Sequence, residues 1–370
     1  MSGRIDAGLS VRIVENGQSS GALSQRVAEL EAASPMAHPF QTDSFVALFN
    51  SDPSRSHFTL IAVDGQGVAA SWRGYFAPHS DGLFPRSTAW MKSLPVLRPD
   101  LLDDRDTVLA SLLAELKRHM GRQGVGHAIF TSETLHDGLC DETCLSQGFR
   151  RRDLQTYLID LTPSEEELWQ NIEPAGRWAA NKARKRGVAV EQIAADEDVR
   201  AYYRLYMDTA SVPGSGPPSE AQFVSGFRRL REEGKARILV ARYEGRIVAG
   251  SFFPCHAGLA AQLQTAVGRE GRKLNASSLL LWESMLAFKR DGFHSLDLVS
   301  VEVAPPEGSR EAGVREFKSK WGGKLLDTPA YVYASSTTRL SQAAGERLRG
   351  LKASLGAFRR SSAQKGRPDD

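Results

Sequence analysis

The chain has 370 residues, of which 41% are hydrophobic and 25% are charged, and its formal net charge is +3. This is the composition of an ordinary soluble globular protein, and the length favours two domains over one. The small net charge excludes a protein that coats nucleic acid, so phosphate recognition would have to be local. The apolar stretches are too short to span a bilayer, and the N-terminus lacks the apolar core of a signal peptide.

Three cysteines give no disulfide framework, which together with the missing signal peptide predicts a reduced, cytoplasmic protein. His136, Cys140 and Cys144 fall at helical spacing. Zinc sites normally need four ligands, and the sequence has no second cluster to supply the others. We therefore expect buried thiols beside a surface histidine, and no metal site.

The first half of the chain alternates between strand and helix patterns. Asp64, Gly65 and Gly67 lie between two strand patterns and predict a hairpin turn. Gly121 is expected to end the third helix. Residues 78–99 are rich in Gly, Pro, Trp and Phe and predict an irregular loop at the surface or lining a cleft. The predicted strands are 9–14, 58–63, 68–76 and 127–131, and the predicted helices are 22–33, 38–49, 106–120 and 135–147.

The second half repeats this order. Ser164 follows a strand pattern and precedes three glutamates, which places acidic side chains at the positive end of a helix dipole. That helix is expected to carry a block of basic residues. The later pattern predicts strands at 156–161, 237–243, 246–255, 260–267, 294–301 and 331–334, and helices at 196–210, 220–233, 275–290 and 314–321.

Both halves show a hairpin, a helix and a strand in the same order, followed by a loop and an aromatic-rich segment. Tandem copies of one α/β module explain this repetition better than a single doubly wound sheet. We predict an N-terminal domain at 1–153, a C-terminal domain at 154–338, and a basic tail at 339–370 that is partly helical and otherwise disordered.

Two segments are candidates for binding phosphate. The first is a basic block without an intervening acid, which includes Arg177 and Lys182. The second precedes the predicted helix 275–290, where backbone amides and cations would meet a pyrophosphate. The plain alternatives are a solvated basic helix face for the first and a basic turn for the second. The candidate cofactor-binding residues of the second segment are Gly268, Gly271, Arg272, Lys273 and Asn275.

Several short motifs, taken in order, resemble the FemABX family, the aminoacyltransferases that build peptidoglycan cross-bridges. The resemblance covers nearly the whole chain apart from the C-terminal tail. The motifs are His38-Pro-Phe-Gln41, Gly148-Phe149, Thr156-Tyr-Leu-Ile-Asp-Leu161, Arg177 with Lys182-Ala183 before Gly187-Val188, and Phe317-Lys-Ser-Lys-Trp-Gly-Gly323.

The resemblance implies two fused GNAT-like acyltransferase domains of α/β (α+β) class, packed around a shared cleft. It also implies an acyltransferase that forms an amide on an amine of a UDP-linked or lipid-linked peptidoglycan precursor. The chain departs from some members in one respect, because residues 196–233 are too short and too proline-interrupted for a long helical-hairpin insertion. The acyl donor, aminoacyl-tRNA or acyl-CoA, therefore stays open, and we expect no other cofactor.

Two further functions remain alternatives. One is an acyl-CoA-dependent N-acyltransferase for another small amine or a polysaccharide. The other is a non-catalytic GNAT-like binding module whose basic tail docks on anionic lipid at the inner face of the membrane. The tail has an apolar side, but it is short and contains Gly350 and Gly356.

The sequence contains no nucleophile elbow and no credible catalytic triad, so direct attack by the amine is expected. On the family resemblance, Lys318 would stabilise the tetrahedral oxyanion, and Asp297 or Glu302 would accept the amine proton. Each also has a plain explanation, a surface lysine on a short helix or a carboxylate at a strand end. The predicted substrate-binding residues are Arg177, Lys182, Phe317 and Gln41.

Overall fold

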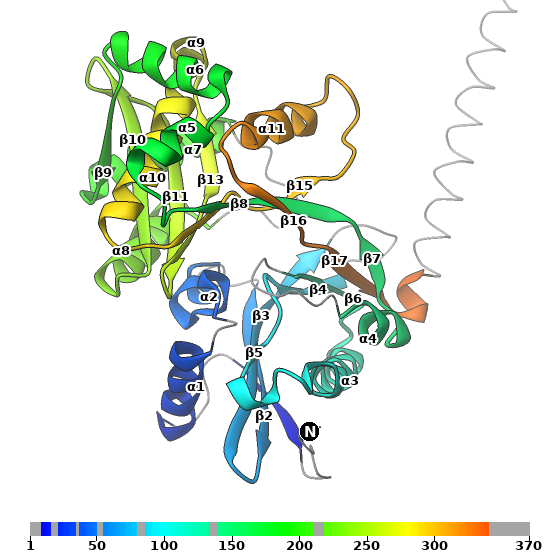
Figure 1. The fold of residues 1–370 in the computed structure, drawn as a ribbon. Helices are drawn as coiled ribbons and strands as arrows, with labels where there is room; N and C mark the ends of the chain where they lie inside the picture. The colour runs from blue at the N-terminus through cyan, green and yellow to red at the C-terminus, as the bar shows by residue number, and fades with distance from the viewer. Residues whose placement is uncertain are drawn as a thin grey trace, which may run out of the picture.

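The computed structural model describes residues 9–15, 21–34, 37–49, 55–79, 86–132, 140–209 and 218–339. These residues form two β-sheets with helices packed against them (Figure 1). The predicted architecture of two α/β modules is confirmed. No helix in this part of the chain is long and apolar enough to cross a membrane.

The first sheet has the strand order β1-β2-β3-β4-β6-β17-β7, with β5 paired to β3. The predicted hairpin is its β2–β3 pair, in which Asp64 lies opposite Gly67. The strands are β1 (Ser10–Glu15), β2 (Ser56–Asp64), β3 (Gly67–His79), β4 (Arg86–Met91), β5 (Val96–Leu97), β6 (His127–Thr131) and β7 (Arg150–Arg152). The helices of this half are α1 (Gly21–Ala33), η1 (Pro39–Gln41), α2 (Asp43–Phe49), η2 (Pro99–Leu101), α3 (Arg105–Gln123) and α4 (Asp141–Ser146).

The second sheet has the order β15-β8-β14-β12-β11-β10-β9, with β13 paired to β11 and β16 paired to β8. Its strands are β8 (Leu154–Asp160), β9 (Ala189–Ile193), β10 (Ala236–Tyr243), β11 (Arg246–His256), β12 (Leu259–Ala261), β13 (Leu263–Val267), β14 (Ser295–Asp297), β15 (Val301–Glu302) and β16 (Lys324–Asp327). Its helices are α5 (Glu165–Asn171), α6 (Pro174–Lys185), α7 (Asp196–Thr209), α8 (Glu220–Glu232), α9 (Arg269–Leu274), α10 (Ala276–Arg290) and α11 (Arg310–Ser319).

The two sheets repeat one topological feature. Each contains one parallel strand pair, β4 with β6 in the first and β12 with β14 in the second, among otherwise antiparallel strands. A parallel pair needs a crossover connection. In the first sheet this connection includes α3, and in the second it includes α9 and α10. The repetition predicted from the sequence is therefore visible in the strand pairing.

A two-stranded ribbon joins the two sheets (Figure 1). The chain leaves the first sheet through β7 and enters the second through β8. It returns through β16, which pairs with β8, and β17 (Ala330–Ala334), which pairs with both β6 and β7. The predicted domain 154–338 included β17, but by its pairing this strand belongs to the first sheet.

Some predicted elements were wrong in detail. Residues 78–99 contain β4, which lies inside the first sheet between β3 and β6; the turn-forming residues around it masked its short strand pattern. Helix α3 continues past Gly121 and ends at Gly124, which has the left-handed φ of 67°. Pro174 begins a separate helix α6, so the segment after Ser164 is broken. Strands β5, β7, β9 and β16 and helix α9 were not predicted.

Other predictions are confirmed or fall outside the described residues. Ser164 caps α5 through a capping box with Glu167, as its position predicted. Cys140 and Cys144 are buried free thiols, and burial raises the pKa of the Cys140 thiol to about 11. His136 and residues 340–370 of the predicted tail lie outside the described residues.

The domains meet through a shared hydrophobic cluster. Phe40, Phe45 and Leu48 of the first half pack with residues of α7, α8 and the second sheet. The contact between α2 and α8 is close, because a Cβ atom added at Gly226 would lie 2.4 Å from the Cδ1 atom of Leu48. The two sheets therefore pack as parts of one body rather than as separately tethered domains.

Candidate active site

A cavity of about 290 Å³ lies between β13 and α11 in the second half. It forms because β12 pairs with β14 on one side, whereas β13, the continuation of β12, pairs only with β11. The side of β13 without a neighbouring strand faces α11. The polar groups of the lining include Gln262, Thr265, Ser277, Arg272, Arg310 and Lys318.

Among the residues that the structure describes, the lining contains three cations and no carboxylate. Arg272 and Arg310 form no ion pair shorter than 4.0 Å with any residue that the structure describes. Guanidinium groups of this kind are suited to two-pronged hydrogen bonding with phosphate or carboxylate oxygens. The positive charge of this lining therefore favours an anionic ligand.

Lys318 is partly buried on α11, and its Nζ atom donates a hydrogen bond to the carbonyl oxygen of Val299 at 3.1 Å. Burial lowers the pKa of its ammonium to about 8, and the nearby charge of Asp297 opposes this shift. The helix is anchored at its start, where the Ser309 hydroxyl accepts from the backbone N–H of Ala312. At pH 7 the side chain is mostly protonated and can donate hydrogen bonds to a developing oxyanion.

Phe317 lines the same cavity beside Lys318. Its ring packs against the fully buried Trp321, with the ring centroids 5.8 Å apart. The aromatic pair fixes the C-terminal turn of α11 against the core. The sequence motif thus brings an apolar wall and a partly buried cation to one place.

Asp297 is fully buried and does not line the cavity. Its carboxylate accepts hydrogen bonds from Thr156 Oγ1 at 2.5 Å and from the backbone N–H of Val299 at 2.7 Å. Val299 has a left-handed φ of 63°, which is strained for a β-branched residue. Asp297 thus holds the turn whose carbonyl oxygen binds Lys318. This geometry fits a positioning role better than the predicted role of proton acceptor.

Glu302 lies on β15, beside a second hollow of about 380 Å³. Its carboxylate pairs with Arg152, and its backbone oxygen accepts from Arg315 at 2.8 Å. The two hollows share Arg310 and Val314 on α11. Glu302 is therefore a neighbour of the Lys318 cavity, not part of its lining.

The predicted phosphate-binding turn lies on α9 and at the start of α10. Arg272 lines the Lys318 cavity, and Lys273 is exposed nearby. A Cβ atom at Gly271 would lie 2.3 Å from the Val248 carbonyl oxygen, so this position requires glycine. Gly268 caps the start of α9, and Asn275 adopts a left-handed φ of 59° between the two helices. The turn therefore presents one cation, Arg272, to the cavity on a closely packed backbone.

The structure places the other predicted substrate-binding residues elsewhere. Arg177 donates hydrogen bonds to three carbonyl oxygens at the end of α5, among them that of Gln170 at 2.9 Å. Lys182 lies over the ring of Trp178, with Nζ 4.2 Å from the centroid. Gln41 is buried in the first domain, where its amide bonds Leu94 and Arg73. None of the three lines the Lys318 cavity.

Three residues of the cavity lining, Gln262, Thr265 and Arg310, were not predicted from the sequence. Gln262 Nε2 donates to Ser251 Oγ at 3.2 Å, and that hydroxyl lies 2.9 Å from Thr265 Oγ1. Polar side chains that interrupt an apolar strand pattern were an available signal for the first two. Arg310 gave no signal, because it follows a proline-containing loop whose path the sequence does not specify.

Comparisons with known proteins agree with this fold. Residues 176–318 match the family model described as an acetyltransferase (GNAT) domain. The chain matches no curated protein. Among solved structures it is similar to FemX, with 13% identity, coverage of 85% of this chain and 96% of that one, and a TM-score of 0.66.

Two other solved structures share the fold. A tandem GNAT protein from the clavulanic acid biosynthesis pathway has 14% identity, covering 88% of this chain and 98% of that one, with a TM-score of 0.55. L-PGS from Bacillus licheniformis has 14% identity, covering 89% and 97%, with a TM-score of 0.53. The predicted tandem GNAT-like fold is confirmed, and the GNAT domain in the second half supports the predicted enzyme class, an acyltransferase.

Proposed function

We propose that the chain is an N-acyltransferase that uses the Lys318 cavity to form an amide on an amine of a peptidoglycan precursor. The observation that carries this proposal is the cavity in the GNAT domain, whose described lining residues include three cations and no carboxylate. Such a lining suits a phosphate-bearing donor or acceptor. The motif resemblance and the fold shared with FemX support the peptidoglycan acceptor.

In the proposed reaction the acceptor nitrogen attacks the carbonyl carbon of the donor ester or thioester. A C–N bond forms and the carbonyl oxygen becomes an oxyanion, which the Lys318 ammonium stabilises. Collapse of this intermediate breaks the C–O or C–S bond, and the proton lost by the amine ends on the departing oxygen or sulfur. Asp297 keeps Val299, and through it Lys318, in position. Arg272 and Arg310 bind the anionic part of a substrate.

The donor is either an aminoacyl-tRNA or an acyl-CoA. The family match to an acetyltransferase domain favours a second candidate function, an acyl-CoA-dependent N-acyltransferase for another small amine or a polysaccharide. Both candidates use the same cavity and the same lysine. They differ in the donor that delivers the acyl group.

A donor screen tests both. Purified protein is incubated with a precursor peptide or a panel of amines, and with either aminoacyl-tRNA or acyl-CoA, and products are identified by mass spectrometry. We expect a mass increase that Lys318→Met abolishes and that one donor class alone supports. Absence of any product with every donor would contradict the proposed function.

Contact of the basic tail with anionic lipid remains a separate prediction. A variant truncated after Leu340 and compared with the full chain for activity and membrane distribution tests it. Loss of membrane distribution with retained activity is the expected result. Unchanged membrane distribution would contradict the prediction that the tail contacts lipid.

A further inference from the structure

Another cavity, separate from the Lys318 site, lies at the boundary between the two domains. Its volume is about 410 Å³, within the range of small-molecule sites, which runs from about 300 to 1,000 Å³. The strands β1, β2 and β3 and the helices α1 and α2 contribute its first-domain walls, and α8 with Lys235 contributes the second-domain wall. It shares no lining residue with the Lys318 cavity.

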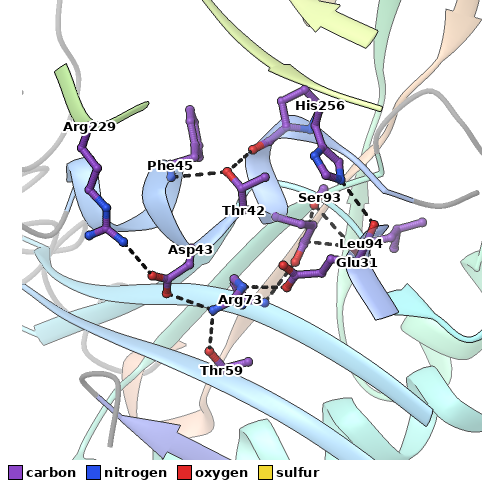
Figure 2. Close-up of polar contacts among 12 residues, drawn as sticks. Glu31, Thr42, Asp43, Phe45, Thr59, Arg73, Ser93, Leu94, Arg229 and His256 are labelled. Carbon is purple, nitrogen blue, oxygen red and sulfur yellow. Dashed lines mark hydrogen bonds and ion pairs between the residues drawn. The ribbon is translucent and has the colours of Figure 1, made fainter. Parts of the chain in front are cut away.

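Six charged side chains line this cavity and alternate in sign. Figure 2 shows four of them, Glu31, Arg73, Asp43 and Arg229. Successive members are joined by ion pairs of 2.8, 3.1, 3.4, 3.0 and 3.0 Å. Asp43 bridges the two domains, because it contacts Arg73 of the first and Arg229 of the second. The order of the chain of charges is Glu31, Arg73, Asp43, Arg229, Glu233 and Lys235.

The Glu31 end of this chain is buried, and the middle of the chain is open. The side chains of Arg73 and Glu31 are 12% and 10% exposed, whereas those of Arg229 and Asp43 are 55% and 52% exposed. Burial raises the pKa of the Glu31 carboxyl even though Arg73 is beside it. A buried ion pair facing an open cavity pays a desolvation penalty that a bound polar ligand would reduce.

The alternation of charge restricts the kind of ligand that fits. A simple anion would approach three carboxylates, and a simple cation would approach three basic groups. An apolar ligand would remove six charged groups from water without replacing their hydrogen bonds. A zwitterion places a carboxylate on a guanidinium and an ammonium on the neighbouring carboxylate, so both of its charges gain charge-assisted hydrogen bonds.

We propose that this interdomain cavity is a second ligand site, which binds a zwitterion of amino-acid to dipeptide size. The ligand carboxylate binds Arg229 or Arg73, and its ammonium binds Asp43 or Glu31. Hydroxyl groups of Thr59 and Ser44 lie on the same walls. Because the charges come from both domains, the bound ligand also stabilises the interdomain contact.

Calorimetric titration of the full chain tests this site without any assay of acyl transfer. The probes are the common amino acids and L-alanyl-L-alanine at millimolar concentration, each compared with its N-acetylated and its amidated derivative. At least one zwitterion is expected to bind saturably. Its two singly charged derivatives are expected to bind roughly tenfold more weakly or worse.

Variants in the exposed middle of the charge chain locate the binding. Arg229→Gln and Asp43→Asn are each expected to weaken binding of that zwitterion roughly tenfold. Arg231→Gln is the matched control, because Arg231 lies on the same helix and bonds the Ala194 carbonyl oxygen outside the cavity. Circular dichroism confirms that each variant is folded.

Three results would overturn the proposal. One is that no zwitterion binds saturably, and another is that the capped derivatives bind as tightly as the parent. The third is that Arg272→Gln, in the Lys318 cavity, weakens binding as much as Arg229→Gln. If the proposed acyl transfer failed while a zwitterion bound as described, this site would stand on its own.

Discussion

Replacing Lys318 by methionine is predicted to stabilise the protein near pH 7 while abolishing acyl transfer. Methionine is similar in length to lysine but cannot be charged. The lysine pKa falls from 10.5 to about 8 in the folded protein, mainly through desolvation. A tenfold change in a protonation equilibrium is worth about 1.4 kcal/mol, so the buried ammonium costs about 3 kcal/mol. The methionine variant also loses the hydrogen bond to Val299, which offsets about 1 kcal/mol of this gain in stability. The net stabilisation is therefore about 2 kcal/mol.

The pH dependence of this gain follows from proton linkage. Between pH 8 and 10.5 the unfolded chain binds more protons at this site than the folded protein does, so wild-type stability rises with pH across that window. The advantage of the methionine variant is therefore full below pH 8 and is lost by about pH 10.5. It is measured by denaturant unfolding of both proteins at pH 7 and at pH 10.

Lys320→Met is the matched control. Lys320 lies two residues away, and its side chain is 26% exposed. It pairs with the exposed Glu316 one helical turn back, a pair worth about 0.5 kcal/mol at most. Its replacement is expected to change stability little at either pH. The reasoning on Lys318 is refuted if Lys318→Met destabilises the protein at pH 7, or if its effect is the same at both pH values.

Three other variants test parts of the structure. Gly271→Ala is predicted to destabilise the protein by about 1–3 kcal/mol, because its Cβ atom would lie 2.3 Å from the Val248 carbonyl oxygen. Thermal unfolding measures this effect. Gly121→Ala in α3 is the control, because a Cβ atom there would have no neighbouring atom within 4 Å. Arg177→Gln is predicted to lower stability by about 1–3 kcal/mol, because hydrogen bonds at the end of α5 are lost, and to leave the substrate KM unchanged. A raised KM at unchanged stability would instead indicate that Arg177 binds substrate. Thr156→Val is predicted to lower kcat by loosening Asp297 without changing KM, and an unchanged kcat would show that Asp297 does not position the turn at Val299.

The order of elements could be predicted from the sequence because hydrophobic periodicity and capping residues are local signals. Ser164 and the 64–67 turn are examples, and both lie where the pattern placed them. Strand β17 shows what local signals leave out. Its residues predict a strand, but only pairing with β6 and β7 shows that the chain has returned to the first sheet.

The candidate site was predictable only where its residues are neighbours in the sequence. Phe317 and Lys318 came from one motif, and both line the cavity. Arg177 and Gln41 looked equally functional in sequence, yet their polar groups are occupied by backbone contacts that no spacing rule reveals. Conversely, Arg310 reaches the cavity through the fold alone, since α11 carries it to the wall shared with the second hollow.

The charge of Lys318 during acyl transfer is the central claim, and a pH–rate profile measures it most directly. With the donor found by the screen, kcat is followed from pH 6 to pH 10 for the wild type and for Lys318→Arg. Because the pKa of Lys318 is about 8, wild-type kcat is predicted to fall above that pH. The arginine variant, which stays charged throughout, is predicted to lack that fall. The same decline in both proteins, or a rise of wild-type kcat through pH 8, would contradict a cationic role for this lysine.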